Sequence, residues 1–259
     1  MQRHDDYQVM PFPLERMVTI QGRRLASRKH TVYALIEVDV TRPRQLIREH
    51  KARTGEALSF TAFVIACLGK AIDENKRMHA YRDWRNRLIL FDEVDVNTMI
   101  EIDSAGRKMV LPHWIRGANQ RTFREIHDEI RAVQAKPEQT REFGVKWLAL
   151  LPQLAWDIFF WAIFKNPHWL KKSYGTVGVT AVGMFGKGIG WAIPFGTHTL
   201  DIALGGIGEK PGVVDGRIEI REYLCMTICL DHDIVDGAPA ARFTSRLKEL
   251  IENGNGLSG

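Results

Sequence analysis

Residues 223–241 read YLCMTICLDHDIVDGAPAA, and this stretch decides the fold of the chain. From Tyr223 to Leu230 both the odd-numbered and the even-numbered residues are largely apolar. Because alternate residues of a β-strand point to opposite faces of the sheet, this pattern is typical of a strand with both faces buried. The strand runs directly into Asp231-His232-Asp233, so we expect a histidine between two carboxylates at the end of an inner strand. Gly237 permits backbone conformations that are closed to other residues, and a helix is predicted over residues 238–253.

Upstream of this stretch, strand-like and helix-like segments alternate along the chain. Val214-Asp215-Gly216-Arg217 predicts a tight turn between two antiparallel strands, because Asp-Gly is a strong hairpin signal. Thr41 as the N-cap and Pro43 in the first turn mark the start of one helix, and Ser59 or Thr61 caps another. The apolar periodicities predict strands over residues 32–40, 94–102, 108–115, 176–182, 200–206 and 217–230, and helices over residues 41–52, 61–72, 122–134 and 238–253.

The composition is that of an ordinary globular domain with a mild excess of positive charge. The 259 residues are 45% hydrophobic and 26% charged, with a formal net charge of +5. This length fits one large domain or two small ones, and it can bury enough surface to fold without a disulfide or a metal. The positive surface is either simply solvated or complements a phosphate-bearing coenzyme. A nucleic-acid partner is not expected, because basic runs interleaved with aromatic residues are absent from the sequence.

The cysteines and the N-terminus favour a cytoplasmic protein. Cys67, Cys225 and Cys229 have no C-x-x-C spacing, so the sequence supports neither a disulfide framework nor a zinc site. Cys225 and Cys229 belong to the buried strand and are predicted to be core thiols. Residues 1–30 are expected to form an N-terminal arm, without the apolar segment of a signal peptide. Residues 31–259 are expected to form a single domain.

Residues 147–164 form an apolar segment that interrupts this pattern. They contain a single charged residue, Asp157, and they approach the length of a membrane span. Pro152 lies inside the run and Pro167 follows it, so we expect the segment to pack on the core, against another subunit or as an apolar lid. A transmembrane or membrane-surface helix is the less favoured interpretation. The whole insert is expected to cover about residues 147–170.

The spacing His232-x-x-x-Asp236-Gly237 carries the strongest functional signal in the sequence. A histidine at a strand end is by itself more often structural than catalytic. This spacing resembles the signature of the acyltransferase superfamily that includes chloramphenicol acetyltransferase and the catalytic domain of the dihydrolipoamide acyltransferases of 2-oxo acid dehydrogenase complexes. Similarity to these catalytic domains also covers residues 37–41, 58–63, 175–186, 213–218 and 230–250.

The resemblance implies an α/β fold, a two-layer sandwich in which helices cover a mixed β-sheet, and a homotrimer with its active sites between subunits. It implies acyl transfer between coenzyme A and a dihydrolipoyl-type thiol, or a small hydroxyl or amine acceptor. His232 would be the general base that takes the proton of the acceptor. Thr180 of a neighbouring subunit would stabilise the tetrahedral oxyanion, and Asp236 would order the loop.

The second motif of the family is expected beside the acyl-CoA. Gly183-Met184-Phe185-Gly186, together with Gly237, would let a pantetheine arm approach the backbone closely, although a plain flexible loop is the alternative reading of the glycines. Asp236 is expected to pair with an arginine, for which Arg24 and Arg28 are candidates. No metal is expected.

Several features depart from the family pattern. The sequence predicts no lipoyl domain and no lipoyl group on this chain, so the expected acceptor is a lipoyl-bearing partner protein or a small molecule. Asp233 follows His232 where an arginine is common, and Ala181 stands where an asparagine is frequent. Two alternatives to an enzyme stay open: a trimeric scaffold without activity, and a relative that residues 147–164 anchor to a membrane or a partner.

Overall fold

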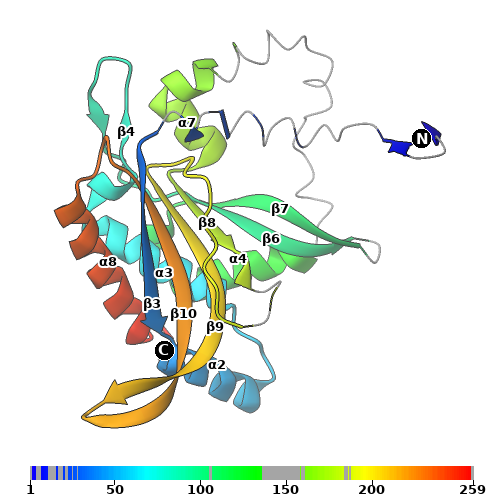
Figure 1. Ribbon diagram of the computed structural model, residues 1–259, viewed down its shortest axis with the longest axis vertical. Coiled ribbons are helices and arrows are strands. Elements are labelled where there is room, and N and C mark those ends of the chain that lie inside the picture. Colours follow the sequence, from blue (N-terminus) through cyan, green and yellow to red (C-terminus); the bar gives the residue numbers. More distant parts are fainter. Residues whose placement is uncertain are drawn as a thin grey trace.

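A mixed six-stranded sheet with helices packed on one face forms the body of the molecule (Figure 1). The computed structural model describes residues 31–104, 107–135, 158, 161–183, 186 and 188–257, and within the N-terminal segment residues 2, 3, 7–10, 16, 20, 23, 24, 26, 27, 29 and 30.

The strand order in the sheet is β3-β10-β9-β8-β6-β7. The inner strand β10 pairs antiparallel with β3 and β9, β8 runs parallel to both β9 and β6, and β7 closes the far edge antiparallel to β6. The strands are β3 Thr31–Asp39, β6 Val96–Ser104, β7 Arg107–Ile115, β8 Val177–Ala181, β9 Leu200–Val214 and β10 Arg217–Asp231; the short pairs are β1 Gln2–Arg3 with β2 Gln8–Val9 and β4 Tyr81–Arg82 with β5 Leu88–Ile89.

Helix α3 is the centre of the helical layer, between α4 and α8 (Figure 1). It begins after Ser59, whose side chain accepts a hydrogen bond from the Ala62 amide, and nine of its residues are buried, so it packs on most sides. The helices are α2 Thr41–Thr54, α3 Phe60–Asp73, α4 Phe123–Ala135, α7 Pro167–Tyr174 and α8 Gly237–Glu252, with 3-10 turns η1 Lys76–His79 and η2 Ala118–Gln120.

The expected α/β sandwich with a mixed sheet is confirmed, and Cys225 and Cys229 are buried thiols as predicted. Cys67 is buried as well. One local prediction was wrong. Thr41 does not cap α2 but is its first residue, because its hydroxyl donates to the Asp39 carboxylate at 2.6 Å instead.

The hairpin of β9 and β10 extends beyond the rest of the sheet (Figure 1). Asp215 and Gly216 have φ angles of 48° and 77°, as the predicted Asp-Gly turn requires. Both strands are 15 residues long, so β9 continues well past the predicted end near Gly206. Val213, Ile218 and Ile220 on the projecting part are exposed.

A second, smaller apolar cluster lies at the end of the molecule where β4 and α7 meet. Tyr81 and Phe91 pack there with Ile163 and Leu170, and the Tyr81 hydroxyl donates to the Gly175 carbonyl at 2.8 Å. Residues 161–165 are helical, and this cluster ties them to the body. Most of the apolar segment 147–164 lies outside the described residues. In the part of the chain that the structure describes, no helix has the length and apolarity to cross a membrane.

His79 is a fully buried histidine between the small cluster and the main core. Its Nδ1 faces the Thr176 hydroxyl at 3.0 Å and its Nε2 faces the Phe91 carbonyl at 3.2 Å. A neutral ring satisfies both contacts by donating from Nε2 and accepting at Nδ1. Burial disfavours the charged ring and lowers the pKa of His79 from 6.5 to about 4.

We therefore expect His79 to make the fold acid-sensitive. Between pH 6.5 and pH 4 the unfolded chain binds a proton at this residue and the folded chain does not, so stability falls as the pH drops through that window. The loss approaches about 3 kcal/mol at its lower end. Urea unfolding at pH 7 and pH 4.5 should show a smaller loss for His79→Gln than for the wild type. The exposed His168→Gln should match the wild type, and equal losses in all three proteins would contradict the prediction.

Candidate active site

His232 lies in the turn that follows β10, and its side chain is exposed. Its amide donates to the His30 carbonyl at 2.9 Å, and the Asp231 amide donates to the Thr199 carbonyl at 2.9 Å. The Asp231 carbonyl accepts hydrogen bonds from the two residues that close the turn, Ile234 and Val235, each at 3.0 Å. The backbone of the turn is therefore held from both sides, while the imidazole stays open to a reactant.

The two carboxylates beside His232 are both paired. Lys29 lies 3.3 Å from Asp231, and the Asp233 carboxylate contacts Nδ1 of His30 at 2.9 Å. The hydrogen bond with His30 lowers the pKa of Asp233 below its ordinary value. In the structure the Asp233 carboxylate thus contacts His30, and Arg82 lies 3.9 Å from it.

A buried ion pair of His198 and Asp201 is connected to this turn. Nδ1 of His198 contacts the Asp201 carboxylate at 2.6 Å, and Nε2 contacts the Tyr174 carbonyl at 3.0 Å. Both ring nitrogens face acceptors, so the ring satisfies both contacts when each nitrogen carries a hydrogen. Burial alone would raise the pKa of Asp201, but the charge and hydrogen bonds of His198 outweigh it and lower that pKa. The carbonyl of His198 also accepts from Lys29 at 2.9 Å, which connects the pair to Asp231.

Sequence reasoning missed the pair of His198 and Asp201. The available signal was a histidine three residues before an aspartate at the start of a predicted strand. Gly178 is part of the same arrangement, because a Cβ atom there would lie 1.9 Å from an Asp201 carboxylate oxygen. Glycine is therefore needed at position 178 for the pair to fit beneath β8.

Thr180 and His232 do not meet within one chain. Leu230 of β10 pairs with Leu200 of β9, which in turn pairs with Val177 of β8. Along the strand direction, Thr180 lies three residues to one side of this row of paired residues, and His232 lies two residues to the other side. At about 3.3 Å per residue and 4.8 Å per strand, the two sites are roughly 19 Å apart. Val177 and Val179 face the helical core, so Thr180 faces the opposite side of the sheet, where it is half-buried.

The glycine-rich loop after β8 packs directly on β9. A Cβ atom on Gly183 would lie 1.8 Å from the Gly205 carbonyl, and one on Gly206 would lie 1.9 Å from the Gly188 carbonyl. The Gly206 amide donates to the Gly190 carbonyl at 2.8 Å. These glycines thus permit backbone-to-backbone contact inside the chain, a role that the sequence interpretation did not include. Met184 and Phe185 lie outside the described residues.

A cleft of about 490 Å³ opens where β8 ends and its neighbours continue. Gly183 and Gly186 line it, together with Ser59 at the start of α3 and Thr98 of β6. The Thr98 hydroxyl is buried and has no hydrogen-bond partner among the described residues. An unpaired buried hydroxyl next to the amide end of a helix is a place where a polar group of a ligand can bind.

Asp236 and Gly237 follow the turn of His232 and are exposed at the start of α8. Asp236 is the N-cap residue of this helix, but its side chain makes no capping hydrogen bond. Within the described ranges it forms no ion pair, Arg24 included, and Arg28 lies outside them. The pairing of Asp236 with an arginine therefore stays a prediction.

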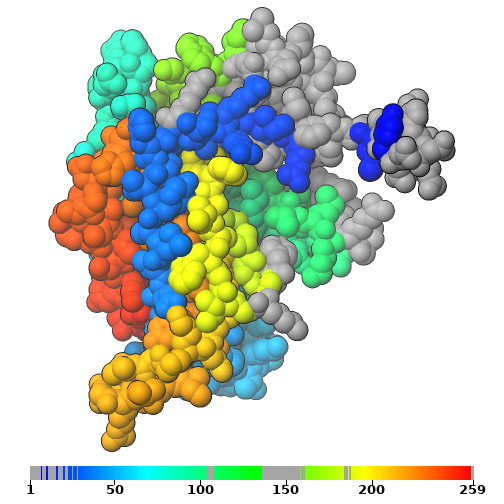
Figure 2. Space-filling view, in the orientation of Figure 1, coloured from blue at the N-terminus to red at the C-terminus, as the bar shows by residue number. Residues whose placement is uncertain are grey.

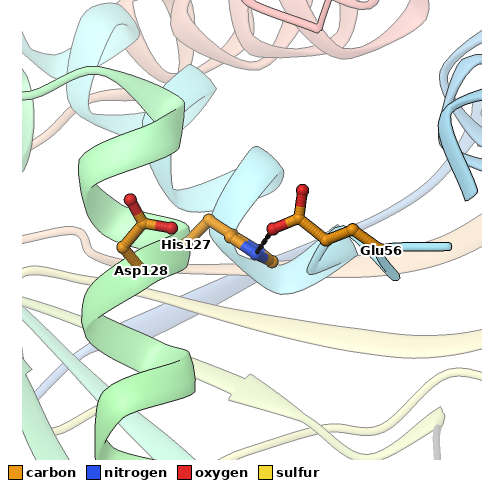
Figure 3. Close-up of side chains that lie close together, drawn as sticks. All are labelled: Glu56, His127 and Asp128. Atoms are coloured by element: carbon orange, nitrogen blue, oxygen red, sulfur yellow. Dashed lines mark hydrogen bonds and ion pairs between the residues drawn. The ribbon is translucent and has the colours of Figure 1, made fainter. Parts of the chain in front are cut away.

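Among the residues that the structure describes, Glu56, His127 and Asp128 form the group that most resembles a metal site (Figure 3). Nδ1 of His127 accepts from the Ser59 amide at 3.0 Å, so its hydrogen is on Nε2, which points to Glu56 at 3.3 Å. Arg124 also binds Glu56, and this hydrogen bond is the main reason that the pKa of Glu56 falls to about 2. Both nitrogens of His127 and the Glu56 carboxylate are thus already used, and His127 serves to hold the start of α3.

Comparison with known proteins places these features in a family. The sequence model of the 2-oxoacid dehydrogenases acyltransferase (catalytic domain) matches residues 10–142 and 171–258. The lipoamide acyltransferase component of the branched-chain α-keto acid dehydrogenase complex of Bacillus subtilis is 24% identical over 226 residues, which cover 85% of this chain and 46% of that protein. This chain spans less than half the length of the curated relatives it matches.

Solved structures share the fold. Dihydrolipoamide acetyltransferase of Azotobacter vinelandii has a TM-score of 0.71 at 17% identity, with 100% of this chain and 99% of that chain covered. Its structure was determined to investigate the role of a serine, a histidine and an asparagine in its catalytic mechanism. Chloramphenicol acetyltransferase has a TM-score of 0.51 at 15% identity, with 95% of this chain and 98% of that chain covered.

Proposed function

Because this chain belongs to the family of the 2-oxoacid dehydrogenase acyltransferases (catalytic domain), we propose that it transfers an acyl group between coenzyme A and a thiol of the dihydrolipoyl type. The observation that carries the proposal is the exposed imidazole of His232 on a backbone-held turn at the end of an inner strand. A small hydroxyl or amine compound is the other class of acceptor that this chemistry allows.

The spacing of the site residues supports these roles. In the Azotobacter protein the serine precedes the histidine by 52 residues, and the asparagine follows the histidine by four. Thr180 precedes His232 by the same 52 residues, and Asp236 follows it by four. We assign His232 as general base and Thr180 as the oxyanion donor, with a hydroxyl retained where the relative has serine. Asp236 has the position of the asparagine and would order the loop.

The proposed reaction needs one base and one hydrogen-bond donor. His232 takes the proton of the acceptor thiol as its sulfur attacks the thioester carbonyl, which makes a thiolate available at neutral pH. The Thr180 hydroxyl donates to the oxyanion of the tetrahedral intermediate. The intermediate then expels the thiolate of coenzyme A, which receives the proton from the His232 imidazolium. No covalent acyl-enzyme forms.

The distance between the two residues supports an active site between subunits. Thr180 and His232 are roughly 19 Å apart in one chain, too far to act on one carbonyl. We therefore propose a homotrimer in which His232 of one subunit faces Thr180 of the next. In a closed ring of three chains, one such heterologous contact forms at each of the three interfaces.

The cleft beside the glycine-rich loop is the proposed site of acyl-CoA. It lies at the end of β8, one residue from Thr180, and Gly183 and Gly186 line it. The unpaired Thr98 hydroxyl offers a hydrogen-bond partner to an amide of the pantetheine arm. Met184, Phe185 and, on the neighbouring subunit, Gly237 complete the proposed contacts.

The direct test is an acyl-transfer assay with the purified protein. Acetyl-CoA is mixed with dihydrolipoamide, a small alcohol or a small amine, and acetylated products are measured by mass spectrometry. We expect S-acetyl-dihydrolipoamide above the uncatalysed background. Calorimetry with coenzyme A separates the alternatives, because a protein that neither binds coenzyme A nor forms a product would be a scaffold rather than an enzyme.

A further inference from the structure

A second cleft lies beside the turn of His232, at the opposite end of the sheet from the proposed acyl-CoA cleft. Its volume is about 1050 Å³, and Asp231, Asp233 and Ile234 form one side of it. The ring of His232 is not part of the lining. An occupant of this cleft would lie against the backbone turn that carries His232, between the residues on either side of it.

Described residues of the insert form another wall of the cleft. Ile158, Trp161 and Phe164 line the cleft, and Trp161 is 58% exposed. The family model leaves residues 143–170 unmatched, so this wall is a feature of this chain rather than of the family pattern. Figure 2 shows residues 81–90 and 161–174 at the same end of the molecule, next to β3.

The residues of this wall pack against the body of the protein, although the side chain of Trp161 stays exposed. Ile163 is buried against Tyr81 and Leu170, and the rings of Phe164 and Tyr174 lie 5.4 Å apart. The same helical turn therefore buries one side in the small cluster and presents Trp161 to the cleft. A large apolar side chain held at a cleft wall in this way is suited to cover an apolar part of a ligand.

The acidic side chains in the cleft all have hydrogen-bond or ion-pair partners, whereas some of the basic side chains do not have close ones among the described residues. Asp83 accepts hydrogen bonds from two backbone amides and from Arg87, and the carboxylates of Asp231 and Asp233 are paired with Lys29 and His30. Arg82 reaches Asp233 only at 3.9 Å.

Lys165 lies in the same cleft and forms no ion pair with any residue that the structure describes. With the three carboxylates already paired, Lys165 is left as a cation without an ion pair among the described residues, and an anionic group complements it.

We infer that this cleft binds the acyl acceptor, and that the acceptor is a small amphipathic thiol whose apolar body carries an anionic end. The inference rests on the proposed function: acyl-CoA occupies the cleft beside the glycine-rich loop, and the second reactant must reach His232 from its own side. Trp161 covers the apolar body, and Lys165 with Arg82 receives the anion. A free thiol acid fits this description better than a lipoyl group bound to a carrier protein, which has an uncharged amide at that end.

Binding of lipoate tests the cleft without any catalysis. Calorimetry is run with lipoate and with lipoamide on the wild type, Trp161→Ala and Trp169→Ala. Trp169 is a matched control, because it is 55% exposed on α7 but does not line the cleft. We expect Trp161→Ala to weaken lipoate binding about tenfold or more, and Trp169→Ala to leave it unchanged. A wild type that binds no lipoate, or a Trp161→Ala variant that binds it equally well, overturns the inference.

A charge variant tests the anionic end. The wild type should prefer lipoate to lipoamide, and Lys165→Gln should reduce this preference about fivefold, while Lys172→Gln on α7 should not. An unchanged preference in Lys165→Gln contradicts the assignment of the anion. Light scattering checks that each variant keeps the assembly state of the wild type. Failure of acyl transfer with normal lipoate binding would sink the proposed function and leave the cleft assignment standing.

Discussion

Replacing His232 by alanine should lower kcat for transfer from acetyl-CoA to dihydrolipoamide by about 10²- to 10⁴-fold. Without the imidazole, the acceptor thiol of pKa about 8.5 must lose its proton to water, and only a few per cent is ionised at neutral pH. The proton that the departing thiolate needs is also no longer supplied. Steady-state rates at saturating acetyl-CoA measure this loss directly.

The fold should survive the change at His232. Its side chain is exposed and the turn is held by backbone hydrogen bonds, so the free energy of unfolding should change by no more than about 0.5 kcal/mol. His168→Ala is a suitable control, since this residue is an exposed histidine on α7. An alanine variant at position 232 that keeps more than a tenth of the wild-type rate would rule out the general-base role.

Mixed trimers should restore activity that neither parent variant has. His232→Ala lacks the base, and Thr180→Ala lacks the oxyanion donor, which lowers kcat by about 10²- to 10³-fold. In a ring that contains both kinds of chain, one of the three interfaces joins an intact His232 to an intact Thr180. The purified mixed trimer should therefore have about a third of the wild-type activity.

Co-expression with two different affinity tags, followed by purification on both, isolates these mixed trimers. Differently tagged copies of His232→Ala alone are the control and should stay inactive. If the doubly purified assembly shows no more activity than its parents, the site does not lie between subunits, and the 19 Å separation would have to close within one chain.

Local patterns in the sequence were sufficient for most elements of the fold. The hairpin of β9 and β10 was predicted from Asp215 and Gly216, because that pair alone accommodates the left-handed backbone of a tight turn. The buried strand β10 was predicted because its odd-numbered and its even-numbered residues are both largely apolar. The exposed position of His232 was predicted because polar residues follow that strand. Such signals depend only on neighbours a few residues apart.

The family resemblance supplied the proposed roles of Thr180 and His232, but their separation became visible only in the folded chain. The distance follows from the registers of three strands, which the spacing of 52 residues does not encode. The close packing of Gly183 on Gly205 is of the same kind. From the sequence these glycines indicated a flexible loop or a ligand contact, whereas their backbones touch each other.

The sequence by itself thus determined the order of strands and helices, the motif around His232 and the family. Only the tertiary structure decided which groups face that motif: Lys29 across from Asp231, His198 against Asp201, and Trp161 on the wall of the adjacent cleft. The physical reason is the separation in sequence over which each effect acts. Turn geometry and apolar periodicity act over a few residues, whereas burial and charge pairing act between side chains that come together only after the chain has folded.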